Sequence, residues 1–250
     1  MSYDTLVQPF TQPERRQVEG FNLYFAVAGG DVGVTLAEVG DDGAIAAVLQ
    51  EQRITKQAIK TDGSLTAIRW AAPILLDAGQ RYALCVAVAD TTTALHVAQV
   101  GMTTSGGNVV TAANTNIGTL LRITQAGSVV EQKGTMLRFD LLAVQYAASE
   151  ERIVIGTAEV DDATLLAVNA GANQPEATAR ATYTLDLIAD GVVKQTHNVD
   201  AMQPVRLTVP FTGEVRVTAT LRVGATGLGA VLEPGTMLVV GVLQTSGTYI

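Results

Sequence analysis

The sequence is poor in charged and aromatic residues. Only 16% of its 250 residues are charged and 5% are aromatic, whereas 48% are hydrophobic. So little charge excludes an intrinsically disordered chain, because little opposes collapse. The formal net charge of −8 argues against a nucleic-acid-binding protein and against binding to an anionic membrane, since both need a basic surface.

Cysteine is nearly absent, and long apolar runs are missing. Cys85 is the only cysteine, so we expect no internal disulfide and synthesis in a cytoplasm. Residues 1–9 have neither the basic start nor the apolar core of a secretion signal. The longest apolar runs, residues 82–89 and 237–243, are far too short to span a bilayer, so they predict buried strands and no membrane insertion.

What the sequence does contain is period-two alternation. In residues 215–223 every odd position is Val, Ala or Leu, and every even position is Arg or Thr. Residues 180–188 and 205–209 alternate in the same way, which predicts strands with one face on a core and one in water. Turn residues at Asp190-Gly191 and Thr212-Gly213 are expected to end these strands.

The first half shows similar short segments. Residues 21–27 and 32–36 alternate and are separated by Gly29-Gly30-Asp31, and a strand over 45–54 is expected to lead into one helical turn near 55–59. Strands spaced by about 8–12 residues without a helical period indicate sandwiches or barrels. We therefore predict an all-β chain of two β-sandwich domains, of jelly-roll or immunoglobulin-like type.

A Gly/Ser/Thr-rich stretch predicts the domain boundary. Residues 102–117 are small and polar and cannot bury enough apolar area to order themselves, so we interpret them as a linker. The predicted domains are an N-terminal sandwich over residues 1–101 and a C-terminal sandwich over residues 118–250.

Candidates for catalysis are few. The two histidines are His96, in an apolar strand, and His197, in a polar hairpin. Neither belongs to a triad motif, so we expect both to be structural or solvated. Cys85 lies in an apolar strand and is expected to be a buried small hydrophobe rather than a thiolate. We predict no enzyme and no catalytic residue.

Metal and cofactor signals are equally weak. Asp41-Asp42 and Asp161-Asp162 are acidic pairs at expected loops, but neither shows the alternating oxygen ligands of a calcium loop. Gly29-Gly30 and Gly106-Gly107 lack the Lys and the following helix of a phosphate-binding loop. We predict no metal site and no cofactor. The acidic pairs are expected to be solvated turn residues.

Aromatic residues leave glycan binding open as an alternative. Sugars stack on exposed rings and bond to polar side chains. Trp70 shares a strand face with Ile68 and is expected in the core. Tyr24 lies opposite the face of Phe21, Leu23 and Phe25, so it is the aromatic that we expect to be exposed, as a surface contact to a sugar or to another subunit.

Four segments stand out in order along the chain: residues 8–10 with 16–26, residues 73–84, residues 96–101, and residues 118–121 leading to Gly127-Ser128 and 137–141. Together these segments resemble a group of β-sandwich virion proteins of tailed bacteriophages and prophages. The resemblance covers most of residues 8–146 in order, and the rest more loosely. The chain departs from the pattern at Val129-Val130, where relatives often place a Trp.

This resemblance implies a structural protein of the phage tail, in a tail tip, baseplate or tail-fibre base. It implies other tail proteins as partners, location in the virion and synthesis in the host cytoplasm, and no catalytic residue. The positive mean hydropathy of +0.27 fits apolar surface buried against other subunits. We expect a homo-oligomer, with a trimer as the first guess from tail architecture. A module that binds a host-surface glycan is the alternative.

Overall fold

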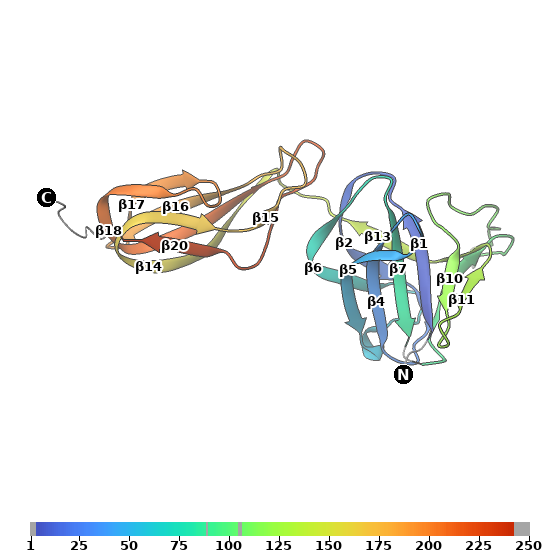
Figure 1. Cartoon of the computed structure of the whole chain (residues 1–250). Coiled ribbons are helices and arrows are strands. Elements are labelled where there is room, and N and C mark those ends of the chain that lie inside the picture. Colours follow the sequence, from blue (N-terminus) through green and yellow to red (C-terminus); the bar gives the residue numbers. More distant parts are fainter. Residues whose placement is uncertain (1–3, 89, 105–106, 243–250) are drawn as a thin grey trace. The chain divides into compact units, whose positions relative to one another are not determined.

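The computed structural model describes residues 4–88, 90–104 and 107–242. It is 61% strand and 1% helix, which confirms the predicted all-β class. No helix among these residues is long and apolar enough to cross a membrane. The chain divides into two compact units, Met1–Val144 and Gln145–Ile250 (Figure 1).

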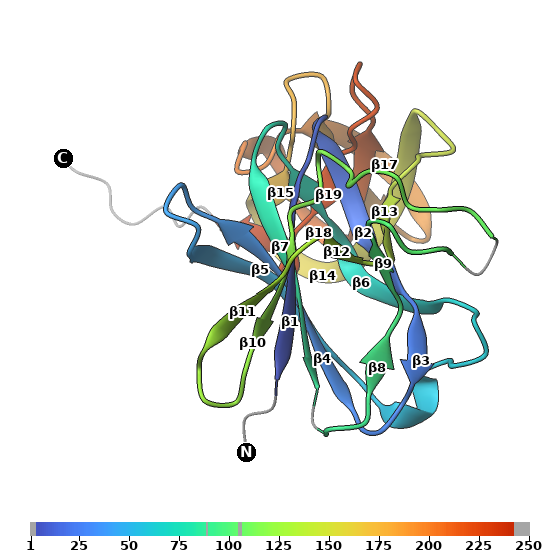
Figure 2. The ribbon, with the colours of Figure 1, turned by 90° about the vertical axis from the view of Figure 1, so that its right-hand side faces the viewer.

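The larger sheet of the first unit has six antiparallel strands in the order β11-β10-β1-β7-β4-β5. Figure 2 shows the β10–β11 hairpin beside β1. The strands are β1 (Thr5–Thr11), β4 (Val32–Val39), β5 (Ile45–Ile54), β7 (Arg81–Val88), β10 (Leu120–Ile123) and β11 (Val129–Gln132). The expected helical turn after β5 is the 3-10 helix η1 (Lys56–Ala58).

A second sheet of the first unit has three strands in the order β13-β2-β6. They are β2 (Arg16–Leu23), β6 (Thr66–Leu76) and β13 (Phe139–Ala143). Two short pairs complete the unit: β3 (Phe25–Val27) with β8 (Ala94–Leu95), and β9 (Val97–Gln99) with β12 (Thr135–Leu137).

The core of the first unit contains buried residues of both sheets. Phe10 of β1 and Phe21 of β2 belong to one hydrophobic cluster, and their ring centroids lie 6.3 Å apart in an edge-to-face contact. Phe21 also contacts Trp70 at 5.5 Å and Phe139 at 5.9 Å. The two sheets therefore pack as sandwich-like layers, and Trp70 contributes to the core as predicted, although it is only partly buried.

The predicted domain boundary is wrong. β10 pairs with β1, β12 with β9 and β13 with β2, so residues 120–143 complete the first unit. The side chain of Gln8, which is fully buried, holds this segment in place. Its Nε2 donates to Gly118 O at 2.6 Å, and its Oε1 accepts from Leu137 N at 2.7 Å. Sequence composition cannot show pairing across more than 100 residues.

The predicted linker is also misplaced. Residues 102–117 connect β9 to β10 within the first unit. Thr103 forms an isolated bridge with Val109, and Ile117 forms one with Phe10 of β1. The segment is a loop anchored at both ends. The division between the units falls instead at residues 144 and 145.

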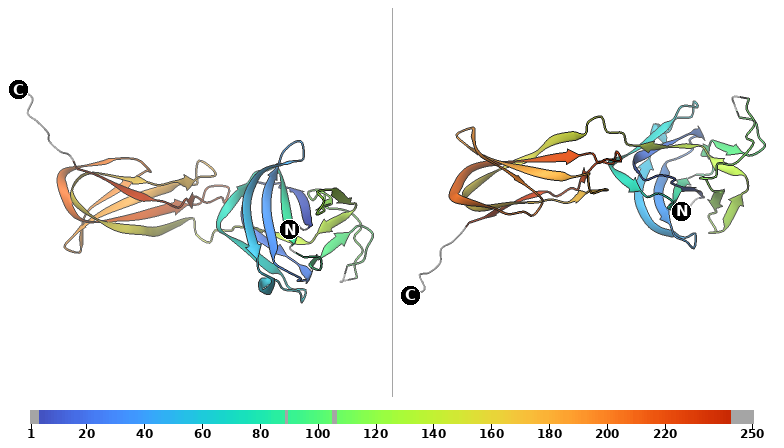
Figure 3. Two further views of the ribbon diagram at one scale, coloured as in Figure 1. Left: turned by 60° about the horizontal axis from the view of Figure 1, so that its bottom comes forward. Right: turned by 90° about the horizontal axis from the view of Figure 1, so that it is seen from above.

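The second unit has a five-stranded antiparallel sheet in the order β17-β16-β18-β14-β20. Two of its strands are 20 and 18 residues long, and Figure 3 shows them running along the unit. The strands are β14 (Glu150–Asn169), β16 (Ala181–Ala189), β17 (Val192–Val199), β18 (Val205–Arg222) and β20 (Met237–Gly241), with a separate pair β15 (Ala172–Asn173) and β19 (Val231–Leu232).

The long strands are interrupted by bulges. The register between β14 and β18 shifts at Val160/Ala163, opposite Phe211 and Gly213. Gly213 has a φ of 147°, and a Cβ there would lie 2.5 Å from Ile188 O. The turn expected at Thr212-Gly213 is therefore wrong, because the chain continues as one strand through a bulge.

One hydrophobic cluster contains buried residues from three neighbouring strands of this sheet, β14, β16 and β18. Leu166 and Val168 of β14 lie in the same cluster as Leu185 of β16 and Val217 of β18. β20 pairs only with residues 165–169 of β14. The predicted alternation is confirmed by burial in β16 and in residues 214–219. It is wrong at Thr220, which is predicted to face water but is only 6% exposed, and at Val209, which is predicted to face the core but is 67% exposed. Asp190-Gly191 forms the predicted turn with φ values of 53° and 72°.

Candidate functional site

Tyr24, the predicted surface aromatic, lies between β2 and β3 and is partly buried. Its hydroxyl donates to Asp140 Oδ2 at 2.8 Å, and Arg138 Cζ lies 3.8 Å from its ring centroid. The hydrogen bond to Asp140 raises the pKa of Tyr24 above its usual value. One ring face and the hydroxyl are therefore already engaged by the chain itself.

Backbone hydrogen bonds bring three distant segments together at this place. His96 N donates to Tyr24 O at 2.8 Å, and Arg138 N donates to His96 O at 3.0 Å. Asn22 Nδ2 donates to Asp140 Oδ2 at 3.2 Å, while Asn22 Oδ1 is buried without a hydrogen-bond partner among the described residues. The group offers donors and acceptors for a polar ligand, and it presents no nucleophile next to a base.

A hollow of about 750 Å³ adjoins this group on the side of His96 and Arg138. Its wall also includes Gln99, Thr103 and Thr104. The sequence did not single out Arg138 or Asp140 as site residues, because the residues that they contact, Asn22 and Tyr24, lie more than 100 residues earlier in the chain. No local sequence pattern predicts a contact between residues so far apart in the chain.

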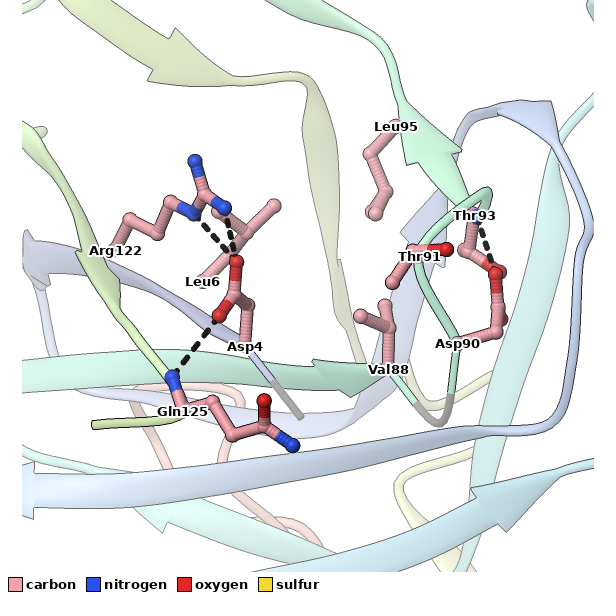
Figure 4. A pocket seen from close by; sticks show the side chains of 9 residues that line it. All are labelled: Asp4, Leu6, Val88, Asp90, Thr91, Thr93, Leu95, Arg122 and Gln125. Carbon is pink, nitrogen blue, oxygen red and sulfur yellow. Dashed lines mark hydrogen bonds and ion pairs between the residues drawn. The ribbon is translucent and has the colours of Figure 1, made fainter. Parts of the chain in front are cut away.

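A second, smaller hollow of about 330 Å³ lies at the start of β1 (Figure 4). On one side, Asp4 forms an ion pair with Arg122 and accepts a hydrogen bond from Gln125 N at 3.1 Å. On the other side lie Asp90 and Thr93. The charged side chains of this hollow face partners within the chain.

The loop at Asp90 is tightly hydrogen-bonded. Asp90 Oδ2 accepts from Thr93 Oγ1 at 2.6 Å, and Asp90 Oδ1 accepts from Thr92 N and Thr93 N at 2.6 and 2.7 Å. These bonds, the one from the Thr93 hydroxyl first, lower the pKa of Asp90 to about 2. Thr93 Oγ1 in turn accepts from Gly29 N and Gly30 N. The carboxylate therefore organises the Gly29-Gly30 turn.

The two histidines belong to different units. His197 Nε2 lies 3.2 Å from Gln195 Oε1 on β17 of the second unit, whereas His96 is in the first unit. Cys85 is 8% exposed, and burial raises the pKa of its thiol to about 11. Cys85 is thus the buried small hydrophobe that the sequence predicted, protonated at neutral pH.

Only the first of the two acidic pairs, Asp41-Asp42, lies in a loop. The loop expected at Asp161-Asp162 is wrong, because both residues lie within strand β14, at its bulge opposite β18. Asp42 Oδ1 accepts from Ala44 N at 2.9 Å in the turn after β4. Asp161 Oδ1 accepts from Thr212 Oγ1 at 2.9 Å, and Asp162 N donates to the same Thr212 oxygen at 3.0 Å across the bulge of β18. In the ranges that the structure describes, no three His, Cys, Asp or Glu side chains gather as a metal site.

Large apolar side chains are exposed on both units. On the first unit, Val129 and Val130 of the edge strand β11 are exposed. On the second unit, Val209 of β18 and Met237 and Val239 of β20 are exposed. Burial of such groups against another molecule is favourable.

Comparison with known proteins adds no relative. No family model matches the chain, and no curated protein matches it.

Proposed function

We propose that the chain is a structural protein of a bacteriophage tail, within a tail tip, baseplate or tail-fibre base, and acts by protein–protein assembly. The observation that carries the assembly role is the exposed apolar surface along strands of both units, for example at Val130 and Val239. The tail assignment is supported by the resemblance of residues 8–146. The protein is made in the host cytoplasm and resides in the virion.

In this proposal the chain acts by binding its neighbours through apolar surface that is held in a fixed position. Burial of apolar surface is worth about 25 cal/mol per Å², and a standard interface removes about 1,600 Å² from water. Sheets held by a packed core present their edges and loops in fixed positions, so little ordering entropy is lost when a partner docks. Neighbouring tail proteins and further copies of the chain are the partners.

Two measurements test this proposal. Mass spectrometry of purified virions should detect the chain in a fixed ratio to other tail proteins. Light scattering should show the purified protein as a homo-oligomer or in a stable complex with a neighbouring tail protein. A monomer that binds no tail component and is missing from virions would contradict the proposal.

Binding of a host-surface glycan is the second candidate, and the Tyr24 group favours it. The Tyr24 side chain is partly exposed beside its contact with Arg138, and polar side chains line the adjoining hollow. Sugar rings stack on aromatic faces while such groups bond their hydroxyls. A glycan array with Tyr24→Ala, and with Tyr183→Phe in the second core as control, separates the candidates: binding lost only in Tyr24→Ala supports glycan recognition.

A further inference from the structure

Strand β20 forms one edge of the five-stranded sheet, and its outer side is unpaired within the described residues. It pairs with β14 from Leu165↔Gly241 to Asn169↔Met237. No other described strand joins it. Alternate N–H and C=O groups of an edge strand point away from its neighbour. These groups of β20 (Figure 1, red) therefore have no neighbouring strand to pair with among the described residues.

Among the edge strands of the three largest sheets, β20 is the one that lacks a protecting charge or proline in the part of the chain that the structure describes. Natural edge strands carry charged residues or proline that discourage pairing with another chain. In the three largest sheets the edges β11, β5, β13, β6 and β17 all contain a charge, and β6 contains Pro73 as well. β20 reads Met-Leu-Val-Val-Gly and contains neither.

The side chains of β20 favour an apolar partner strand on both faces. Met237 and Val239 lie on one face and are 57% and 40% exposed. Val240 lies on the opposite face and is 41% exposed. Successive residues of an added strand point to alternate faces, so apolar residues in succession suit this edge. β20 itself has that composition.

We propose that β20 is a pairing edge at which two copies of the chain join antiparallel about a twofold axis. In such a contact each residue of the strand meets one from the same short stretch of the other copy. A charged residue near the centre would meet its own copy and repel it, and β20 has none. The pairing would merge two five-stranded sheets into one.

This inference rests on the assembly part of the proposed function and replaces the trimer guess with a twofold contact. With a net charge of −8 on each copy, long-range repulsion opposes self-association and salt screens it. The contact itself is apolar and made by backbone hydrogen bonds. We therefore expect the dimer to tighten as the salt concentration rises.

A cysteine crosslink tests the geometry. Val239 is the central residue of β20, so in a symmetric antiparallel pair Val239→Cys lies near its own copy. The native Cys85 is buried and its thiol has a pKa of about 11, so it does not compete. Under mild oxidation Val239→Cys should form a disulfide dimer. The matched control is Val193→Cys. Val193 lies on the opposite edge strand β17 and is 44% exposed, and the Val193→Cys variant should stay monomeric on a denaturing gel.

A charge placed on the edge tests the energetics in the full-length protein. Val239→Lys should weaken the dimer at least about tenfold in sedimentation equilibrium, because two like charges then face each other. Val193→Lys should leave the dissociation constant unchanged, and equal circular dichroism spectra show that both variants fold.

Three outcomes would overturn the inference: a monomer or a trimer of the unmodified chain, equal crosslinking at positions 193 and 239, or a dimer that weakens as salt is added. A dimer through β20 in a protein that is missing from virions would keep this inference and remove the tail proposal. The two proposals therefore fail separately.

Discussion

The two units close their cores in different ways. In the first unit two separate sheets face each other, and aromatic rings such as Phe10, Phe21 and Phe139 meet between them. In the second unit one sheet with two long, bulged strands supplies the core, and Tyr183 and Phe211 are its only buried aromatics among the described residues. The first unit depends on pairing between distant segments, and the second on irregularities within strands.

The largest effect should come from a charge in the second core. Val217→Asp places a carboxylate at a site that is 6% exposed, on β18. Unpaired burial of a charge costs several kcal/mol, so the second unit should unfold while the first unit keeps its transition in calorimetry. The control Thr218→Asp lies on the opposite face and should be nearly silent. Equal effects would mean that the strand's faces are misassigned.

A cavity in the first core should have the next largest effect. Phe21→Ala removes a fully buried ring, and such a change costs about 3–5 kcal/mol. Thermal unfolding should show a lower melting temperature for the first unit's transition and no change in the second unit's transition. The matched variant Phe211→Ala should shift the second transition instead. If either variant shifts both transitions together, the units do not unfold independently.

The attachment of residues 118–143 to the first unit can be broken at Gln8. Gln8→Ala removes the hydrogen bonds to Gly118 O and Leu137 N. Leaving buried backbone groups unpaired costs about 1–3 kcal/mol, so urea unfolding should show a loss of that size, and hydrogen exchange should quicken in β10 and β12. Gln80→Ala, at a half-buried amide that bonds Val39 O, should cost less.

The smallest effect concerns the Asp90 loop and depends on pH. The folded pKa of Asp90 is lowered from 3.8 to about 2, so its charge stabilises the fold above about pH 4, and this contribution is lost as the pH falls toward 2. Asp90→Asn should lower the melting temperature slightly at pH 7. The difference from the unmodified protein should vanish near pH 2. A difference independent of pH would assign the effect to packing.

Sequence reasoning succeeded where the signal is local. The alternation of residues 215–223 placed Val217 and Ala219 in the core, and Asp190-Gly191 forms the turn that its residue types predict. It failed at Thr212-Gly213, because glycine serves a bulge as well as a turn. It also placed the domain boundary too early, since a polar loop inside a domain has the same composition as a linker.

The candidate site was only partly predictable. Tyr24 stood out because it opposes an apolar strand face. Its partners Arg138 and Asp140 could not be found, because a single exposed Arg or Asp carries no pattern. The unprotected edge of β20 was equally hidden. Its apolar run predicted a buried strand, and this is wrong for the described residues, because β20 ends a sheet and Met237, Val239 and Val240 are exposed.

The sequence by itself determined that this chain is all-β and which faces of several strands are buried, because alternation reflects burial residue by residue. Only the tertiary structure decided which strands pair, where one unit ends and which edge stays open. Many Val-, Ala- and Thr-rich strands could pair with one another at similar local energy. The choice among them depends on closing long loops and filling one core, which involve residues far apart in the chain.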